Sequence, residues 1–162
     1  MGNPATTVAR NEVFVAAPPD AVFDVLGDAR TYADWVVGSR RIRAADRRWP
    51  APGTGFDHTV GTPPLTIDDE TLVLGARAPE LLELTAKARP LPSARITLHL
   101  RPEGNGTRVT MIEDFASRLV NLLAGPLTHA AMRLRNRESL RRLKALAEGT
   151  RPRPTGPLPP RR

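Results

Sequence analysis

The chain contains no cysteine and few aromatic residues. Its 162 residues include four Phe, two Trp and one Tyr. The lack of cysteine excludes disulfides, thiolate nucleophiles and cysteine-based metal sites, and it leaves the redox compartment open. Surfaces that bind nucleic acid usually interleave basic and aromatic side chains, so the scarcity of aromatic residues argues against a nucleic-acid partner.

Long apolar runs are also missing. No segment approaches the roughly 20 apolar residues of a membrane-spanning helix, and the N-terminus lacks the apolar stretch of a signal peptide. We therefore expect a cytoplasmic protein without stable membrane insertion. The segments Met1-Gly2-Asn3-Pro4-Ala5-Thr6 and Asn105-Gly106-Thr107 match a myristoylation and a glycosylation pattern, but both patterns are short enough to arise by chance.

Positive charge is abundant but unevenly placed. Arg151, Arg153, Arg161 and Arg162 supply four of the seven net positive charges from a Pro-rich terminus, so the rest of the chain is only modestly basic. The arginines within residues 40–43 and 135–142 are interpreted as solvated faces of a strand and a helix.

The N-terminal part predicts one strand and two short helices. Residues 1–7 are expected to be flexible, and Val8 to Ala16 has the alternation of a half-buried strand. Pro18 and Pro19 suit the first turn of a helix that ends at Gly27. A second short helix, from about residue 30 to 36, presents Tyr32 and Trp35.

The middle of the chain reads as strands separated by turns. Pro and Gly recur from Ser39 to Asp114, and we predict six strands near 39–47, 54–61, 65–76, 80–89, 93–102 and 107–115. The last two strands show the clearest alternation of apolar and polar residues. Between them, Asn105-Gly106 is expected to supply the positive φ angles of a tight hairpin.

The last third predicts one long helix and a tail. Ser117 to Glu148 is helical in pattern, with a break at Gly125-Pro126 that starts the principal helix. Residues spaced by about 100° per residue form one stripe about 80° wide: His129, Met132, Asn136, Leu140, Leu143 and Ala147. Gly149 ends the helix, and residues 149–162 are expected to form a disordered Pro/Arg-rich tail.

This element order resembles the polyketide cyclase/dehydrase and lipid-transport families of the START (SRPBCC) superfamily. The resemblance spans roughly residues 8 to 148 and rests on four features: Ala17-Pro18-Pro19-Asp20-Ala21-Val22-Phe23-Asp24-Val25-Leu26, Trp35, Gly106-Thr107-Arg108-Val109-Thr110, and Asn136-Arg137-Glu138-Ser139-Leu140-Arg141-Arg142-Leu143-Lys144. It implies an α+β helix-grip fold. A seven-stranded, curved antiparallel sheet would wrap around the long C-terminal helix, with two short helices between strands 1 and 2. It also implies a cavity between sheet and helix, but no shared catalytic residue and no cofactor.

Strand alternation selects two candidate catalytic residues. If Met111 faces the cavity, so does Glu113, and Phe56 would carry His58 inward with it. His58 can act as a general base near neutral pH, and a buried Glu113 beside it would favour the charged form of both. The alternatives stay open, because a bulge would turn His58 outward and strand twist would return Glu113 to solvent.

The other candidates lie on the helices. Asn136 sits at the centre of the apolar stripe, where its amide must bond a strand, a water or a ligand. His129 shares that face near the expected pocket mouth, although solvent exposure is equally plausible. Trp35, Met132 and Tyr32 are expected to supply apolar contact with a ligand.

No metal site is predicted. The three histidines lack metal-ligand spacing. Asp68, Asp69 and Glu70 alternate across a strand, so either Asp69 or the other two face inward. A solvated strand segment is the simpler interpretation.

Two classes of function remain. The first is the binding of a hydrophobic small molecule of the lipid, polyketide or isoprenoid type in an internal cavity. The second is a polyketide cyclase or dehydratase in which His58 and Glu113 move protons. A weaker third is an interaction module that uses the basic helix face and the tail. We expect a monomer or a homodimer in each case.

Overall fold

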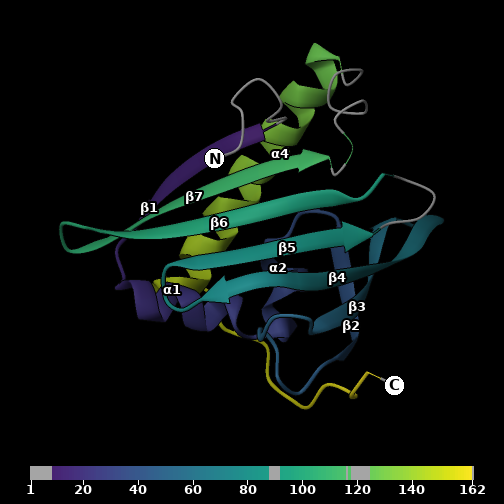
Figure 1. Cartoon of the computed structure of the whole chain (residues 1–162), viewed down its shortest axis with the longest axis horizontal. Coiled ribbons are helices and arrows are strands. Elements are labelled where there is room, and N and C mark those ends of the chain that lie inside the picture. The colour runs from purple at the N-terminus through teal and green to yellow at the C-terminus, as the bar shows by residue number, and fades with distance from the viewer. Residues whose placement is uncertain (1–8, 88–91, 116, 118–124, 162) are drawn as a thin grey trace.

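Seven antiparallel strands form one curved sheet in the order β1-β7-β6-β5-β4-β3-β2 (Figure 1). The computed structural model describes residues 9–87, 92–115, 117 and 125–161. The strands are β1 (Ala9–Val15), β2 (Ser39–Ala45), β3 (Gly55–Thr62), β4 (Leu65–Arg77), β5 (Leu81–Lys87), β6 (Ala94–Glu103) and β7 (Gly106–Phe115). All seven predicted strands are confirmed, as is the α+β helix-grip architecture. The expected flexible segment 1–7 lies outside the described residues.

The β6/β7 hairpin has its positive φ at a different residue from the one predicted. Gly104, with φ of 55°, takes the first central position of the turn, and Asn105 does not have a positive φ. A positive φ at the first central position is the requirement that a type II′ turn places on glycine. Gly106 is needed for a different reason, because a Cβ there would lie 2.2 Å from the Val15 carbonyl oxygen.

Three short helical elements separate β1 from β2. Pro19 starts α1 (Pro19–Leu26), which buries Val22, Phe23, Val25 and Leu26. The predicted second helix is a 3-10 turn, η2 (Ala29–Thr31), followed by α2 (Tyr32–Trp35). The Asp28 side chain accepts a hydrogen bond from the Arg30 backbone N–H and caps this turn. These elements place Tyr32 and Trp35 between the sheet and the C-terminal helix.

The long helix α4 (Pro126–Ala147) packs on β1, α1 and α2. It buries Asn136 near its midpoint and Ser139, Leu140, Leu143 and Leu146 in its C-terminal half. Its N-terminal end reaches beyond the sheet, and Leu127 and Leu134 are exposed there (Figure 1). The helical pattern predicted just before Gly125 lies outside the described residues. Every helix in the described ranges is too short or too polar to span a bilayer.

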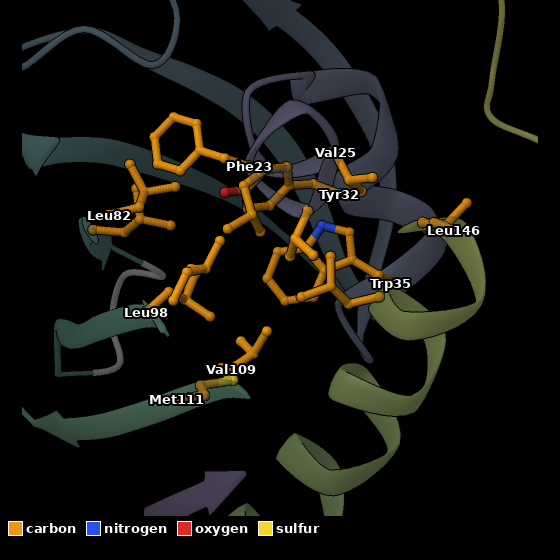
Figure 2. Packing of buried hydrophobic residues seen from close by; sticks show 14 of the residues in the cluster. Phe23, Val25, Tyr32, Trp35, Leu82, Leu98, Val109, Met111 and Leu146 are labelled. Carbon is orange, nitrogen blue, oxygen red and sulfur yellow. The ribbon is translucent and has the colours of Figure 1, made fainter. Parts of the chain in front are cut away.

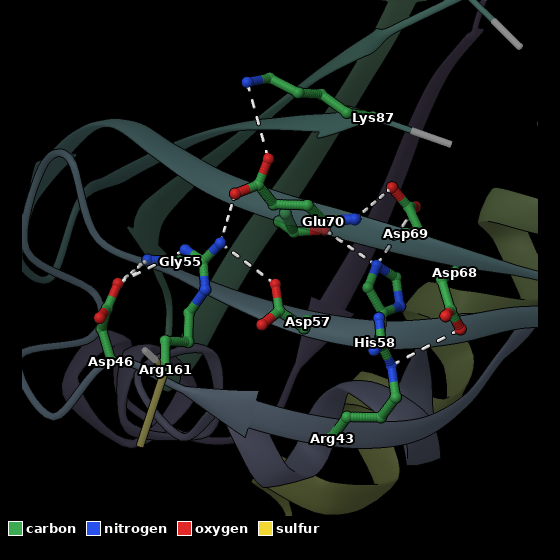
Figure 3. Close-up of polar contacts among 11 residues, drawn as sticks. Arg43, Asp46, Gly55, Asp57, His58, Asp68, Asp69, Glu70, Lys87 and Arg161 are labelled. Carbon is green, nitrogen blue, oxygen red and sulfur yellow. Dashed lines mark hydrogen bonds and ion pairs between the residues drawn. The ribbon is translucent and has the colours of Figure 1, made fainter. Parts of the chain in front are cut away.

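The C-terminal tail differs from the expected disorder. Residues 149–161 run back along the molecule toward β2 and β3 (Figure 1). Ala45 forms a bridge to Pro160, and its N–H donates to the Pro159 carbonyl at 3.0 Å. Arg161 lies between Asp46, Asp57 and Glu70 and forms an ion pair with each (Figure 3). Composition predicted a disordered tail, but these three carboxylates hold its end against the edge strand.

Candidate functional site

A cavity of about 440 Å³ lies between the sheet, α2 and α4. Most of its lining is apolar and comes from strands β3 to β7 and from the segment after α2, including Val36, Val60, Ile67, Leu84, Ile96 and Met111. The volume falls within the range of small-molecule pockets. The cavity lies where the resemblance implied it, between the curved sheet and the long C-terminal helix.

Four polar side chains from β2, β3 and β4 form one wall of this cavity. His58 is at the centre of this wall, and its side chain is 6% exposed. The Nε2 atom lies 3.2 Å from Asp69 Oδ2 and 3.2 Å from Thr71 Oγ1, and Nδ1 lies 2.9 Å from Ser39 Oγ. His58 therefore faces inward, as alternation predicted, and no bulge turns it to solvent.

The carboxylate beside His58 is one that the sequence interpretation assigned to solvent. Asp69 is buried, with its side chain 5% exposed, while its neighbour Asp68 points to the other face and pairs with Arg43 (Figure 3). Asp69 Oδ1 also accepts from the Glu70 backbone N–H at 2.6 Å. The predicted alternation of the acidic run is correct, and Asp69 is the member of the run that faces the cavity.

A second polar group lies on β7 and α4. Glu113 is buried and accepts hydrogen bonds from Asn136 Nδ2 at 2.7 Å and from the Arg135 guanidinium. Asn136 is fully buried, so its predicted position on the inner face is correct, and its amide bonds a side chain of the sheet. Arg135, which the charge pattern placed on a solvated face, has a side chain that is 41% exposed and reaches the cavity lining.

Tyr32 and Trp35 line the cavity as expected, with Met111 and Met132. The Tyr32 ring also packs at a tilt against Trp35 and Phe56, with centroid distances of 4.9 and 4.6 Å. Its hydroxyl lies among apolar side chains, including Leu82 (Figure 2), and has no hydrogen-bond partner among the described residues. Burial raises the pKa of Tyr32 well above its ordinary value, so the hydroxyl stays protonated.

Two expected lining residues lie elsewhere. Phe56 shares the inner face of β3 with His58, but Tyr32 and Trp49 cover it and make it part of the core. His129 is half-buried outside the lining. The face of α4 that meets the cavity runs through Thr128, Met132, Arg135, Asn136 and Ser139.

Other places in the molecule are poorer candidates. A second hollow of about 440 Å³ lies under the tail, but it is open to solvent and lined by charged residues such as Asp28, Arg30 and Arg47. Within the described ranges, no three His, Asp or Glu side chains gather in a way that could hold a metal ion.

Solved structures share this fold at low sequence identity. Protein NE0264 from Nitrosomonas europaea is 19% identical, with a TM-score of 0.71 over 93% of this chain and 100% of that one. Ara h 8.0201 is 11% identical, with a TM-score of 0.68 over 86% of this chain and 96% of that one. DynU16, described as a putative protein in the dynemicin biosynthetic locus, is 19% identical, with a TM-score of 0.65 over 89% of this chain and 48% of that one. No curated protein sequence matches the chain.

The sequence itself matches a family model over residues 6–148, which is most of the chain and includes every element of the cavity. That family is described as polyketide cyclase/dehydrase and lipid transport. The structural neighbours belong to the same START and Bet v1-like group of folds. The chain is therefore a member of the polyketide cyclase/dehydrase and lipid-transport family of the START superfamily.

Proposed function

We propose that this protein binds a hydrophobic small molecule, of the lipid, polyketide or isoprenoid type, in the cavity between the sheet and α4. The observation that supports the proposal is the cavity of about 440 Å³ with a predominantly apolar lining. An apolar ligand that enters it leaves water and contacts Trp35, Ile96 and Met111, so burial of its surface favours binding.

Filling the cavity should weaken binding of an apolar ligand. Ala86 and Ala94 are paired across β5 and β6 and both line the cavity. Replacement of Ala94 by Phe puts a ring into the cavity, whereas Ala130→Phe adds the same ring at an exposed position on α4. We expect the neutral dye Nile red to bind the wild type and Ala130→Phe, and to bind Ala94→Phe at least about ten-fold more weakly.

Native mass spectrometry of the protein purified from its own host would then identify the ligand. We expect a bound apolar species that is lost in Ala94→Phe and retained in Ala130→Phe. If neither Nile red nor any component of host lipid extracts binds the folded wild type, the proposal is wrong.

The buried groups favour a second candidate, an enzyme of the cyclase or dehydratase type. Asp69 orients His58, and Asn136 with Arg135 orients Glu113, and all five side chains line the same cavity. General acid–base catalysis needs such positioned groups around a substrate that is held in a folded conformation.

The enzyme is tested with two thioesters of N-acetylcysteamine. A β-hydroxyacyl thioester can lose its hydroxyl as water, and a poly-β-ketoacyl thioester can form a ring by intramolecular aldol addition and then lose the new hydroxyl as water. Mass spectrometry follows the loss of one water from either substrate. We expect His58→Gln to reduce the rate by about 100-fold or more. His99→Gln, which alters an exposed histidine on β6, should keep the wild-type rate. Equal rates for these two variants would remove His58 from any mechanism.

A further inference from the structure

Among the groups hydrogen-bonded to His58, the Ser39 hydroxyl is the one that can also bond a ligand. Both nitrogens of the ring are occupied, Nε2 by Asp69 and Thr71, and Nδ1 by Ser39. A carboxylate only accepts hydrogen bonds, so Nε2 carries the hydrogen that faces Asp69. His58 therefore has no free nitrogen, and its influence on a ligand passes through the Ser39 hydroxyl.

Ser39 can both accept and donate. When the His58 ring is neutral, Nδ1 accepts the Ser39 hydrogen, and the lone pairs of Ser39 Oγ are left to accept from a ligand hydroxyl. When the ring is protonated, Nδ1–H donates to Oγ, and the Ser39 hydrogen is left for a ligand oxygen. A ligand hydroxyl can bond Ser39 in both states, because it donates and accepts. A ketone oxygen only accepts, so it can bond Ser39 only when the His58 ring is protonated.

The position of Ser39 is fixed by its surroundings. It is buried at the first position of β2 and lines the cavity. Its backbone N–H donates to the Val36 carbonyl at 3.1 Å, and the N–H of Val37 donates to Ser139 Oγ of α4 at 3.0 Å. The loop before β2 is thus tied to the helix, which holds Ser39 in a defined orientation.

The charges of the cavity wall already have partners. Asp69 faces His58, and Glu113 accepts from Arg135 and Asn136. A ligand carboxylate would have to compete with Glu113 for Arg135, and a ligand ammonium would have to compete with His58 for Asp69. Either competition leaves a buried charge less well paired, which is unfavourable. A neutral oxygen group on an apolar body meets no such penalty.

We propose that Ser39, supported by His58 and Asp69, is the specificity-determining group of the cavity and selects apolar ligands that carry a neutral hydroxyl or carbonyl oxygen. This inference rests on the proposed binding function. It names the chemical class of the ligand, namely alcohols, phenols and ketones, and excludes fatty acids, amines and phosphate esters as the preferred cargo.

The test uses four probes of similar shape: 2-methylnaphthalene, 2-naphthol, 2-naphthoate and 2-naphthylmethylamine. Equilibrium dialysis against the full chain at neutral pH gives each dissociation constant. One neutral hydrogen bond changes affinity by about two-fold to ten-fold, so 2-naphthol should bind more tightly than 2-methylnaphthalene by that factor. The two charged probes should bind more weakly than either.

Ser39→Ala should remove the preference for 2-naphthol and leave the affinity for 2-methylnaphthalene unchanged. Ser93→Ala, which alters a serine outside the cavity lining, should keep the preference. Because Ser39→Ala also unpairs His58 Nδ1 and could fail to fold, a crystal structure of the wild type with 2-naphthol is the second measurement. It should place the naphthol oxygen within hydrogen-bond distance of Ser39 Oγ.

The outcomes separate the two proposals. If all four probes fail to bind while Nile red or a host lipid binds, only this inference is wrong. If Nile red and the host lipid extracts also fail to bind, the proposed binding function and this inference are both wrong. If 2-methylnaphthalene binds as tightly as 2-naphthol, or a charged probe binds most tightly, only the inference is overturned. A naphthol oxygen that lies away from Ser39 in the crystal overturns the role of Ser39.

Discussion

His58 Nε2 lies 3.2 Å from Asp69 Oδ2, and the two side chains are 6% and 5% exposed. Removal of one member of a buried pair leaves the other unpaired in a medium that solvates it poorly. Asp69→Leu should therefore lower the free energy of unfolding by about 3 kcal/mol. The same replacement at the neighbouring Asp68, whose side chain is 71% exposed, should change it by less than about 0.5 kcal/mol.

Urea denaturation of both variants measures the difference. The comparison is well matched, because the two aspartates are adjacent on β4 and their side chains point to opposite faces of the sheet. Equal destabilisation by both replacements would show that Asp69 does not form the buried pair described above.

A second prediction concerns Asn136, whose Nδ2 donates to Glu113 Oε2 at 2.7 Å at a fully buried position of α4. Asn136→Ala leaves the carboxylate with one donor fewer, so the free energy of unfolding should fall by about 1 to 3 kcal/mol. Arg137→Ala, on the exposed face of the same helix, should cost less than about 0.5 kcal/mol. Thermal denaturation at neutral pH distinguishes them, and similar losses would contradict the buried hydrogen bond.

The ion pairs of Arg161 indicate that the C-terminal tail contributes to the stability of the fold. Its side chain is 19% exposed and pairs with Asp46, Asp57 and Glu70. Arg161→Ala leaves three carboxylates close together, and we expect a loss of about 1 to 2 kcal/mol with release of the tail. Hydrogen exchange at the Ala45 N–H, which donates to Pro159, should accelerate. Arg153→Ala removes a charge whose side chain makes only a 3.5 Å contact with the Ala21 carbonyl, and exchange at Ala45 should not change.

These contacts also show what the sequence could predict. The alternation of apolar and polar residues in β7 correctly predicted that Met111 and Glu113 point inward, because the two residues are two positions apart on one strand and so face the same side of the sheet. The element order gave the helix-grip fold for a similar reason, since each helix and strand has its own local pattern. Such local periodicities survive in the structure because burial of one face favours them.

Features that depend on distant partners were missed. Ser39 was not recognised as a candidate. Its contact with His58 depends on the register shift between Ser39 and Arg41, and the pattern of apolar and polar residues in the sequence does not reveal such a shift. Asp69 was assigned to solvent, because alternation alone does not say which parity faces in. The ordered tail was missed since its carboxylate partners come from β3, β4 and the segment after β2.

A pH-dependent prediction follows from Glu148 at the end of α4. Its Oε1 accepts from Lys144 Nζ at 2.6 Å and from the Ala16 N–H at 2.7 Å, and these donors hold the pKa of Glu148 below its ordinary value of 4.5. A lowered carboxyl pKa contributes stability that is fully present above pH 4.5 and is lost as the pH falls through the folded-state value.

Glu148→Gln should therefore be less stable than the wild type at pH 7, by about 1 kcal/mol. The gap between the two should narrow as the pH falls below 4.5. Denaturation midpoints measured from pH 7 to pH 3 test this, and a gap that stays constant or widens on acidification would contradict the ion pair.

The last prediction compares two buried hydroxyls. Tyr32 OH is buried without a hydrogen-bond partner among the described residues. Thr31 Oγ1, in contrast, lies 2.8 Å from the carbonyl oxygen of Val25 and 2.8 Å from that of Asp28, and it can donate to either. A buried unpaired polar group carries its full desolvation cost. Tyr32→Phe should therefore raise the free energy of unfolding by about 1 kcal/mol, while the near-isosteric Thr31→Val should lower it by a similar amount or more.

Chemical denaturation of the two variants measures the opposite signs. The result bears on the cavity as well, because a Tyr32 hydroxyl that packs among apolar side chains cannot be the group that orients a ligand. Nile red should then bind Tyr32→Phe as tightly as the wild type. A loss of stability in Tyr32→Phe comparable with that in Thr31→Val would mean that the hydroxyl has a partner in solution, and a ligand or water in the cavity would be the first to test.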